Sequence, residues 1–196
     1  VVPEIDLPGH SLCMATMHSE ILCDYKPKCS ASFGYDTRSA FCASREENYE
    51  LLADILGEVC ELFPSEYIHI GGDEAVKMRW ELCPDCQKAI KENGLKNEDD
   101  LQMFFMSKVN EYLKSKGYSS VMWSYDRIEN AENLNPDVAW TVCGMGDDKD
   151  LIENELKRGR KLINTHCYPY YFDFPYGWNT LKMVCEDDGA LTNNDE

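Results

Sequence analysis

The stretch from Tyr67 to Ala75 joins a short apolar strand to two glycines and two adjacent carboxylates. Gly71 and Gly72 have no Cβ, so a second backbone or a ligand can approach closely there. Two neighbouring carboxylates in a partly desolvated site do not both ionise easily, and the pKa of one of them is raised. The one that keeps its proton can act as a general acid near neutral pH. The sequence therefore predicts a catalytic pair at Asp73 and Glu74.

A second charged motif runs from Val2 to His10. Glu4 and Asp6 are two residues apart, so they share one face of a strand. Two interpretations stay open for Glu4: a hydrogen-bonded polar layer inside a barrel, or part of the site. A Pro-Gly turn places His10 where this strand ends, and we expect it beside the acidic pair. His69 is expected to support the site from within rather than to act in catalysis.

Aromatic side chains close three further apolar segments, at Trp123, Trp140 and Tyr171. One such residue is more often part of a core than part of a site. Three on the same face predict a stacking surface for the apolar side of a sugar, with polar groups supplied by Tyr171 and Asp173. This composition is typical of a carbohydrate pocket.

Strand-like and helical segments alternate along the chain, which predicts parallel strands joined by helical crossovers. Polar and aromatic residues gather where the strands end, as in a (β/α) barrel or a doubly wound sheet. Since the chain has no glycine-rich phosphate loop, we favour the barrel. The expected strands are 1–6, 67–70, 120–123, 138–142 and 161–165; the expected helices are 46–63, 101–116 and 151–158; residues 15–45 are expected to be irregular.

The bulk composition excludes several classes of partner. The 196 residues include 36 acidic and 19 basic side chains, for a net charge of −17. Nucleic acids and anionic membrane surfaces require a basic surface, so neither is expected as a partner. A membrane span needs about 20 consecutive apolar residues, and no such run occurs in the sequence. A neutral sugar remains a suitable substrate.

The ten cysteines do not have the spacing of a small disulfide-stapled domain. The sequence also lacks an N-glycosylation sequon, and both observations favour a reducing, cytoplasmic compartment. Cys83 and Cys86 suggest zinc, but no second pair of ligands stands at a matching spacing. Two free thiols near the start of a helix are the other interpretation, and no metal or cofactor is expected.

The two charged motifs, residues 2–10 and 69–74, resemble the signatures of glycoside hydrolase family 20, the β-N-acetylhexosaminidases. The likeness continues in the same order through Trp80 and residues 121–123, 138–140 and 171–178. The resemblance implies part of a (β/α)8 TIM barrel, whose five strands correspond to the third to seventh of eight. It also implies hydrolysis of terminal β-linked GlcNAc or GalNAc, with retention of configuration.

The resemblance also assigns catalytic roles. The family is an exception to the two-carboxylate nucleophile scheme, because the substrate's own acetamido oxygen attacks the anomeric carbon. Glu74 would protonate the leaving oxygen and later activate water. Asp73 would hold the acetamido nitrogen, and Tyr171 would hydrogen-bond to the acetamido oxygen.

The remaining roles concern substrate binding. Trp123 and Trp140 would wall the acetamido methyl group, Asp173 would bind sugar hydroxyls, and His10 would support the acid. The segment after Trp123 departs from the family, since Ser124-Tyr125 precede the acidic residue. The loop that contacts the aglycone is therefore the least well matched.

The expected organisation is a single partial catalytic domain over residues 1–196, truncated at both ends. Five barrel strands leave two open edges. Another copy, or the rest of a longer chain, is expected to complete the barrel. Two alternatives remain: a non-catalytic carbohydrate-binding half-barrel or inactive fragment, and an unrelated barrel hydrolase with an Asp–Glu pair.

Overall fold

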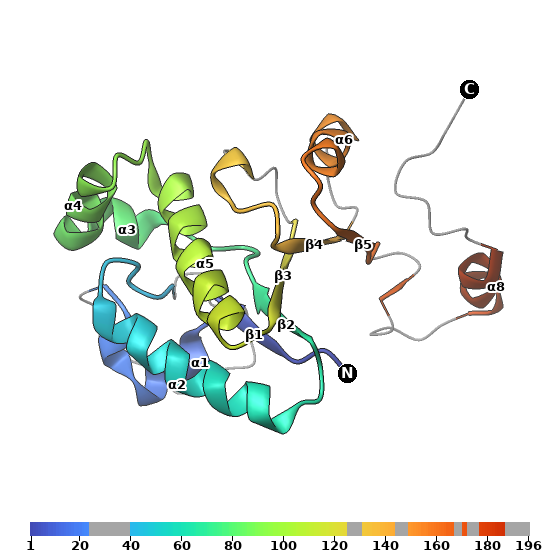
Figure 1. Cartoon of the computed structure of the whole chain (residues 1–196), viewed down its shortest axis with the longest axis horizontal. Helices are drawn as coiled ribbons and strands as arrows, with labels where there is room; N and C mark the ends of the chain where they lie inside the picture. Colours follow the sequence, from blue (N-terminus) through green and yellow to red (C-terminus); the bar gives the residue numbers. More distant parts are fainter. Residues whose placement is uncertain (24–39, 125–130, 144–148, 167–169, 172–176, 187–196) are drawn as a thin grey trace.

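A computed structural model describes residues 1–23, 40–124, 131–143, 149–166, 170–171 and 177–186 of the chain (Figure 1). Its five strands form one sheet in the order β1-β2-β3-β4-β5, and every neighbouring pair is parallel. The predicted α/β class with parallel strands is confirmed. The strands are β1 (Glu4–Leu7), β2 (Tyr67–Gly71), β3 (Ser119–Trp123), β4 (Ala139–Val142) and β5 (Leu162–Asn164).

Helices connect successive strands. The longest two are α2 between β1 and β2, and α5 between β2 and β3. Within the described residues, no helix is both long and apolar enough to cross a membrane. The helical elements are α1 (Leu12–Met17), η1 (Ser19–Ile21), α2 (Glu46–Leu62), α3 (Met78–Leu82), α4 (Pro84–Glu92), α5 (Glu98–Ser115), η2 (Ala131–Asn133), α6 (Lys149–Lys157) and α8 (Trp178–Glu186).

The two faces of the sheet differ in chemistry because side chains alternate along each strand. Ile68 and Ile70 of β2 and Met122 of β3 are fully buried in one apolar cluster with residues of α2 and α5. His69 and Thr141 point to the opposite face, where their side chains contact each other at 3.0 Å. One face therefore carries the core and the other carries polar groups.

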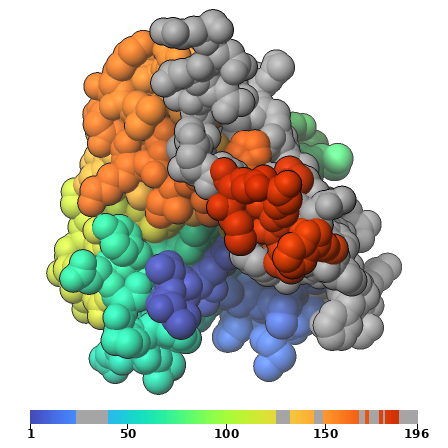
Figure 2. All heavy atoms as spheres, turned by 90° about the vertical axis from the view of Figure 1, so that its right-hand side faces the viewer, coloured from blue at the N-terminus to red at the C-terminus, as the bar shows by residue number. Residues whose placement is uncertain are grey.

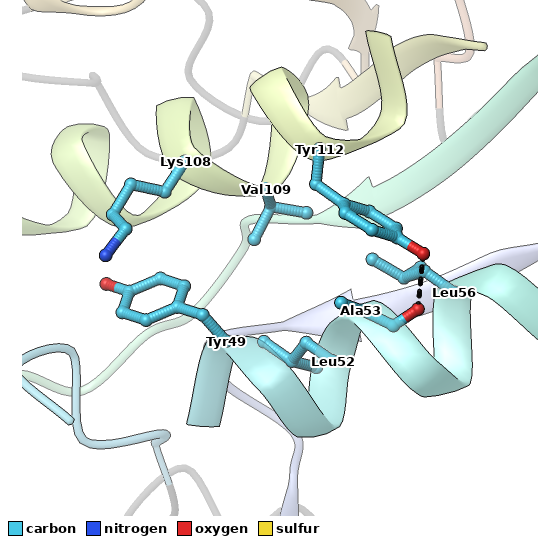
Figure 3. A pocket seen from close by; sticks show the side chains of 7 residues that line it. All are labelled: Tyr49, Leu52, Ala53, Leu56, Lys108, Val109 and Tyr112. Carbon is cyan, nitrogen blue, oxygen red and sulfur yellow. Dashed lines mark hydrogen bonds between the residues drawn. The ribbon is translucent and has the colours of Figure 1, made fainter. Parts of the chain in front are cut away.

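Helices α2 and α5 pack against each other through aromatic side chains (Figure 3). The Tyr112 hydroxyl donates a 2.6 Å hydrogen bond to the carbonyl of Ala53, and Lys108 Nζ lies 3.7 Å from the centre of the Tyr49 ring. A small pocket lies along this contact, and its lining contains no carboxylate or thiol. Because it belongs to the helix side of the sheet, we interpret it as a packing seam.

Several elements differ from the sequence predictions. Helix α5 begins at Glu98 rather than Leu101, because the Asn97 side chain accepts a hydrogen bond from the backbone N–H of Asp100 and caps the helix. Helices α3, α4 and α8 were not predicted. The segment expected to be irregular contains η1 and the end of α1, and residues 24–39 lie outside the described part. Helix α8 lies at the end of the molecule beyond β5 (Figure 1). Seen from that end, α8 and the N-terminal residues are both on the surface (Figure 2).

Arg160 connects β4 to the η2 and α6 segments from a fully buried position. Its Nε donates a 2.6 Å hydrogen bond to Glu155, and its Nη1 donates to the carbonyl of Val138 at 2.7 Å. The guanidinium also lies 4.4 Å from the centre of the Trp140 ring. Burial lowers the pKa of Arg160, which the hydrogen bond and charge of Glu155 oppose.

We expect Arg160→Met to lower the free energy of unfolding by about 3–5 kcal/mol. The buried Glu155 would lose one of its two arginine partners, with only Arg158 remaining, and the backbone carbonyls that Arg160 binds would lose their donor. Denaturant unfolding followed by circular dichroism measures the change. The control is Lys157→Met at the end of α6, where the exposed side chain should have an effect within about 0.5 kcal/mol. An equally small effect of Arg160→Met would contradict the prediction.

Candidate active site

The carboxyl ends of β1 and β2 approach each other so closely that residue 71 must be glycine. A Cβ on Gly71 would lie 1.9 Å from Oδ1 of Asp6 and 2.6 Å from its Cα. Gly71 also has a φ of +70°, a conformation that side chains disfavour. The close approach expected at this glycine is therefore real, and it places the Asp6 carboxyl against the loop that follows β2.

His10 lies among three carboxyl groups. Its Nε2 atom is 3.4 Å from Oδ2 of Asp73, 3.4 Å from Oε2 of Glu74 and 4.0 Å from Oδ2 of Asp6. His10 and Glu74 have positive φ angles of 48° and 45°, and such strain in non-glycine residues is concentrated at functional sites. The structure thus brings together His10, Asp73 and Glu74, while their chemical roles stay predictions.

Asp6 and Asp73 form a coupled pair. Burial, together with the charge of Asp73, raises the pKa of Asp6 to about 8. Burial also raises the pKa of Asp73, although the backbone, His10 and Asp6 stabilise its charged form. Asp6 is therefore the member of the pair that keeps a proton near neutral pH.

A second polar group lies on the same face, nearer the amino end of β1. Glu4 accepts a 2.7 Å hydrogen bond from Trp123 Nε1, and its Oε1 is 3.2 Å from Nδ1 of His69. Burial disfavours the charged form of Glu4, but these partners outweigh it and lower the pKa. The Nε2 atom of His69 is in turn 3.0 Å from the Thr141 hydroxyl. His69 is buried, as expected for a residue that supports the site from within.

Trp123 and Tyr171 form the aromatic part of the site. Trp123 ends β3, and its ring centre is 4.7 Å from that of His69 and 6.4 Å from that of Tyr171. The Trp123 and Tyr171 rings meet edge to face at 61°. Tyr171 is 37% exposed. Two of the three predicted aromatic residues therefore lie together.

Trp140 does not join them, which corrects its expected place in the aromatic wall. It is fully buried in the core cluster, and Arg160 lies over its ring. The next residue, Thr141, points to the polar face and contacts His69, so the alternation of β4 directs Trp140 to the helix face. The fourth predicted binding residue, Asp173, lies outside the described residues.

Asp6 is the site residue that the sequence argument missed. Its position two residues after Glu4 was the available signal, because both side chains had to point to the same face. What the pattern did not give was the register of β1 against β2, which brings Asp6 to Asp73. In this register, Glu4 lies opposite His69 and Leu7 lies opposite Gly71.

Comparison with known proteins was consistent across sequence and structure. The family described as glycosyl hydrolase family 20, catalytic domain, matches residues 1–194. A beta-hexosaminidase of Akkermansia muciniphila is 30% identical over 95% of this chain and 39% of its own length. A beta-hexosaminidase of Porphyromonas gingivalis is 35% identical over 63% of this chain and 16% of its own length.

A beta-N-acetylhexosaminidase from Bacteroides fragilis has the same fold, with a TM-score of 0.76 and 31% identity over 91% of this chain and 35% of that protein. A second beta-N-acetylhexosaminidase structure matches with a TM-score of 0.78 over 91% of this chain and 38% of its own length. The chain thus spans well under half the length of these relatives.

The raised pKa of Asp6 predicts an unusual pH dependence of stability. Its ordinary pKa is 3.8 and its folded pKa is about 8, so the folded state binds more protons between these values and is destabilised as the pH rises. We expect Asp6→Asn to raise the melting temperature relative to wild type by several degrees near pH 8. The difference in melting temperature between Asp6→Asn and wild type should narrow as the pH falls towards about 4. Thermal melts at both pH values measure it.

Asp54→Asn, at an exposed position of α2, is the matched control and should change the melting temperature equally at both pH values. A pH-independent effect of Asp6→Asn would show that Asp6 is ionised in the folded protein and would contradict the prediction.

Proposed function

Because the chain belongs to glycosyl hydrolase family 20, we propose that it carries the catalytic centre of a β-N-acetylhexosaminidase, which removes terminal β-linked GlcNAc or GalNAc. The observation that carries this proposal is the contact of His10 with both Asp73 and Glu74 at the carboxyl ends of parallel strands. The names of the relatives, beta-hexosaminidases, support the same activity. A set of acidic groups at this end of a parallel sheet is where (β/α) barrels place their chemistry.

The five strands correspond, in this proposal, to the third to seventh strands of an eight-stranded barrel. The polar face with Glu4, Asp6 and His69 would become the barrel interior. Ile163 of the edge strand β5 is 44% exposed, which is consistent with a neighbour on that side. Further strands from the same protein, or from a second copy, would cover both edges and complete the substrate site.

The reaction would proceed in two steps. In the first, the substrate's acetamido oxygen attacks the anomeric carbon while the bond to the leaving oxygen breaks, and Glu74 gives that oxygen its proton. The product is an oxazolinium ion. In the second, the Glu74 carboxylate takes a proton from water as the water attacks the same carbon, and the bond between that carbon and the acetamido oxygen breaks. The configuration is therefore retained.

Asp73 would stabilise the positive charge that develops on the acetamido nitrogen. Asp6 holds the shared proton, so Asp73 can be an anion even though burial raises its pKa. Within the described residues, Oδ1 of Asp73 is buried and accepts no hydrogen bond, which suits it to an N–H donor of the substrate. A fixed anion at this point stabilises the transition state more than the ground state.

Trp123 and Tyr171 would enclose the acetamido group. The Trp123 ring is held by its hydrogen bond to Glu4 and by contact with His69, so it is oriented before substrate arrives. The Tyr171 hydroxyl would donate to the acetamido oxygen and align it for attack. Asp173 is proposed to bind sugar hydroxyls on the strength of the family motif alone.

Loss of the acid gives the first test. We expect Glu74→Gln in the full-length protein to lower kcat/KM by about 10²–10⁴-fold on chitobiose. The loss should be smaller on 4-nitrophenyl β-GlcNAc, whose leaving group needs less protonation. Asp73→Asn should lower kcat strongly on both substrates, since both use the acetamido group. Steady-state kinetics measure these changes.

Glu58→Gln, an exposed substitution on α2, is the control and should retain full activity. Near-normal turnover by Glu74→Gln or Asp73→Asn would overturn the assigned roles. Binding of GlcNAc by the wild type without any turnover would instead support the carbohydrate-binding alternative.

The two tryptophans give a separate test of the corrected site. We expect Trp123→Ala to raise KM or lower kcat by at least about tenfold, with a modest loss of stability, because its ring faces the polar side of the sheet. Trp140→Ala should cost about 3–5 kcal/mol of stability as a core truncation. The molecules that remain folded should keep the wild-type KM. Kinetics and thermal melts on both variants distinguish these outcomes, and a raised KM in Trp140→Ala alone would reverse the assignment.

A further inference from the structure

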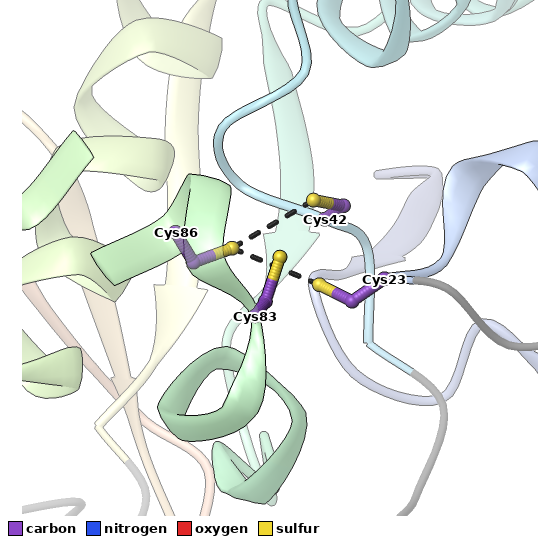
Figure 4. A group of neighbouring side chains, drawn as sticks. All are labelled: Cys23, Cys42, Cys83 and Cys86. Atoms are coloured by element: carbon purple, nitrogen blue, oxygen red, sulfur yellow. Dashed lines mark hydrogen bonds between the residues drawn. The ribbon is translucent and has the colours of Figure 1, made fainter. Parts of the chain in front are cut away.

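Four cysteine sulfur atoms converge at one point beside the candidate site (Figure 4). Cys23, Cys42, Cys83 and Cys86 are all buried, with no more than 5% of any of them exposed. Their sulfur atoms all lie within 4.8 Å of one another. The proposed hydrolysis uses none of these thiols.

The distances fit a single tetrahedral ion. Four sulfurs at about 2.3 Å from a central zinc ion form a tetrahedron with edges of about 3.8 Å. Cys86 Sγ is 3.7 Å from Cys23 Sγ and 3.7 Å from Cys42 Sγ. Two of the six sulfur–sulfur distances thus match those of a zinc-bound set, and the other four do not exceed 4.8 Å.

The same geometry disfavours disulfides. A disulfide joins two sulfurs at about 2.0 Å and draws one pair away from its neighbours. Here Cys86 is equally distant from Cys23 and Cys42, and all four thiols are free. One ion bound by all four sulfurs explains why the two distances from Cys86 are equal. A disulfide between Cys86 and one of the two cysteines does not.

Three chain segments deliver the ligands, and a bridge joins two of them. Cys83 immediately precedes α4 and Cys86 lies in its first turn, so the helix start sets their spacing. Cys23 and Cys42 follow the two residues that form an isolated antiparallel bridge, Leu22 and Phe41. The bridge places these two cysteines side by side, although the sequence separates them.

Surrounding hydrogen bonds hold this arrangement. Trp80 Nε1 donates to the carbonyl of Phe41 at 2.9 Å, which ties the α3 segment to the bridge. The Asn48 side chain donates to the carbonyls of Ile21 and Cys42, both at 2.9 Å. The Ser44 hydroxyl lies 3.2 Å from the sulfur of Cys42. Such outer contacts are what orient the ligands of a metal site.

We propose that these four cysteines bind one structural zinc ion. Four buried protein ligands leave no position for water or substrate, which is the pattern of a structural rather than a catalytic site. The ion would hold the loop after β1, which carries His10, to the segment after β2, which carries Asp73 and Glu74. It would thereby stabilise the two loops whose contact forms the acidic site.

Metal content tests the proposal directly. The full-length protein is purified under reducing conditions, and zinc is measured by inductively coupled plasma mass spectrometry. We expect about one zinc per chain, and at least about a tenfold reduction in both Cys86→Ser and Cys42→Ser. Cys60→Ser is the matched control, since Cys60 is also buried but lies on α2, away from the cluster.

A second measurement does not depend on whether the variants fold. Wild-type protein stripped with a chelator and reloaded with cobalt should show a thiolate-to-cobalt charge-transfer band and a tetrahedral ligand-field spectrum. It should also regain the melting temperature lost on stripping. Three results would each overturn the proposal. The first is wild-type protein that contains no zinc and gives no cobalt thiolate spectrum. The others are iron in place of zinc, and disulfides among the four residues detected by mass spectrometry. Equal zinc in Cys86→Ser and wild type would do the same.

Discussion

Strand β1 passes so close to the carboxyl end of β2 that no side chain fits at residue 71. The Asp6 carboxyl occupies the space a Cβ of Gly71 would need, and the following loop can then turn Asp73 and Glu74 towards His10. Burial and the charge of Asp73 raise the pKa of Asp6 as a consequence of this proximity. The electrostatics of the site therefore rest on a steric condition at one glycine.

The alternation of side chains along the strands extends this arrangement across the sheet. One face packs Ile68, Ile70 and Trp140 against the helices, and the opposite face presents Glu4, His69 and Thr141. Polar groups on the second face are hydrogen-bonded to one another, which is the condition for burying them at low cost. Trp123, anchored by Glu4, connects this polar layer to Tyr171 at the outer rim. The acidic and aromatic parts of the site thus share a common support.

The segments that follow β1 and β2 are also held by contacts outside the sheet. The segment after β1 is held by the carbonyl contacts of Asn48 and Trp80 and by the bridge between Leu22 and Phe41. The buried cysteines lie where this segment meets the start of α4. On the helix side of the sheet, Arg160 connects the later elements, because it donates hydrogen bonds to both Glu155 and the carbonyl of Val138. Both junctions are built from buried polar groups rather than from strand pairing.

The sequence alone determined the strands, the long helices, the glycine pair before Asp73 and Glu74, and the family resemblance, because all of these depend on residues close together in the chain. It also placed His10 beside the acidic pair, since parallel strands end at the same edge of a sheet. Tertiary structure decided what depends on distant pairings. The register of β4 directs Trp140 into the core and Thr141 to the polar face. The register of β1 against β2 places Asp6 beside Asp73. Likewise, only folding brought Cys23 and Cys42 to Cys83 and Cys86, because their separation along the chain carries no information about their distance in space.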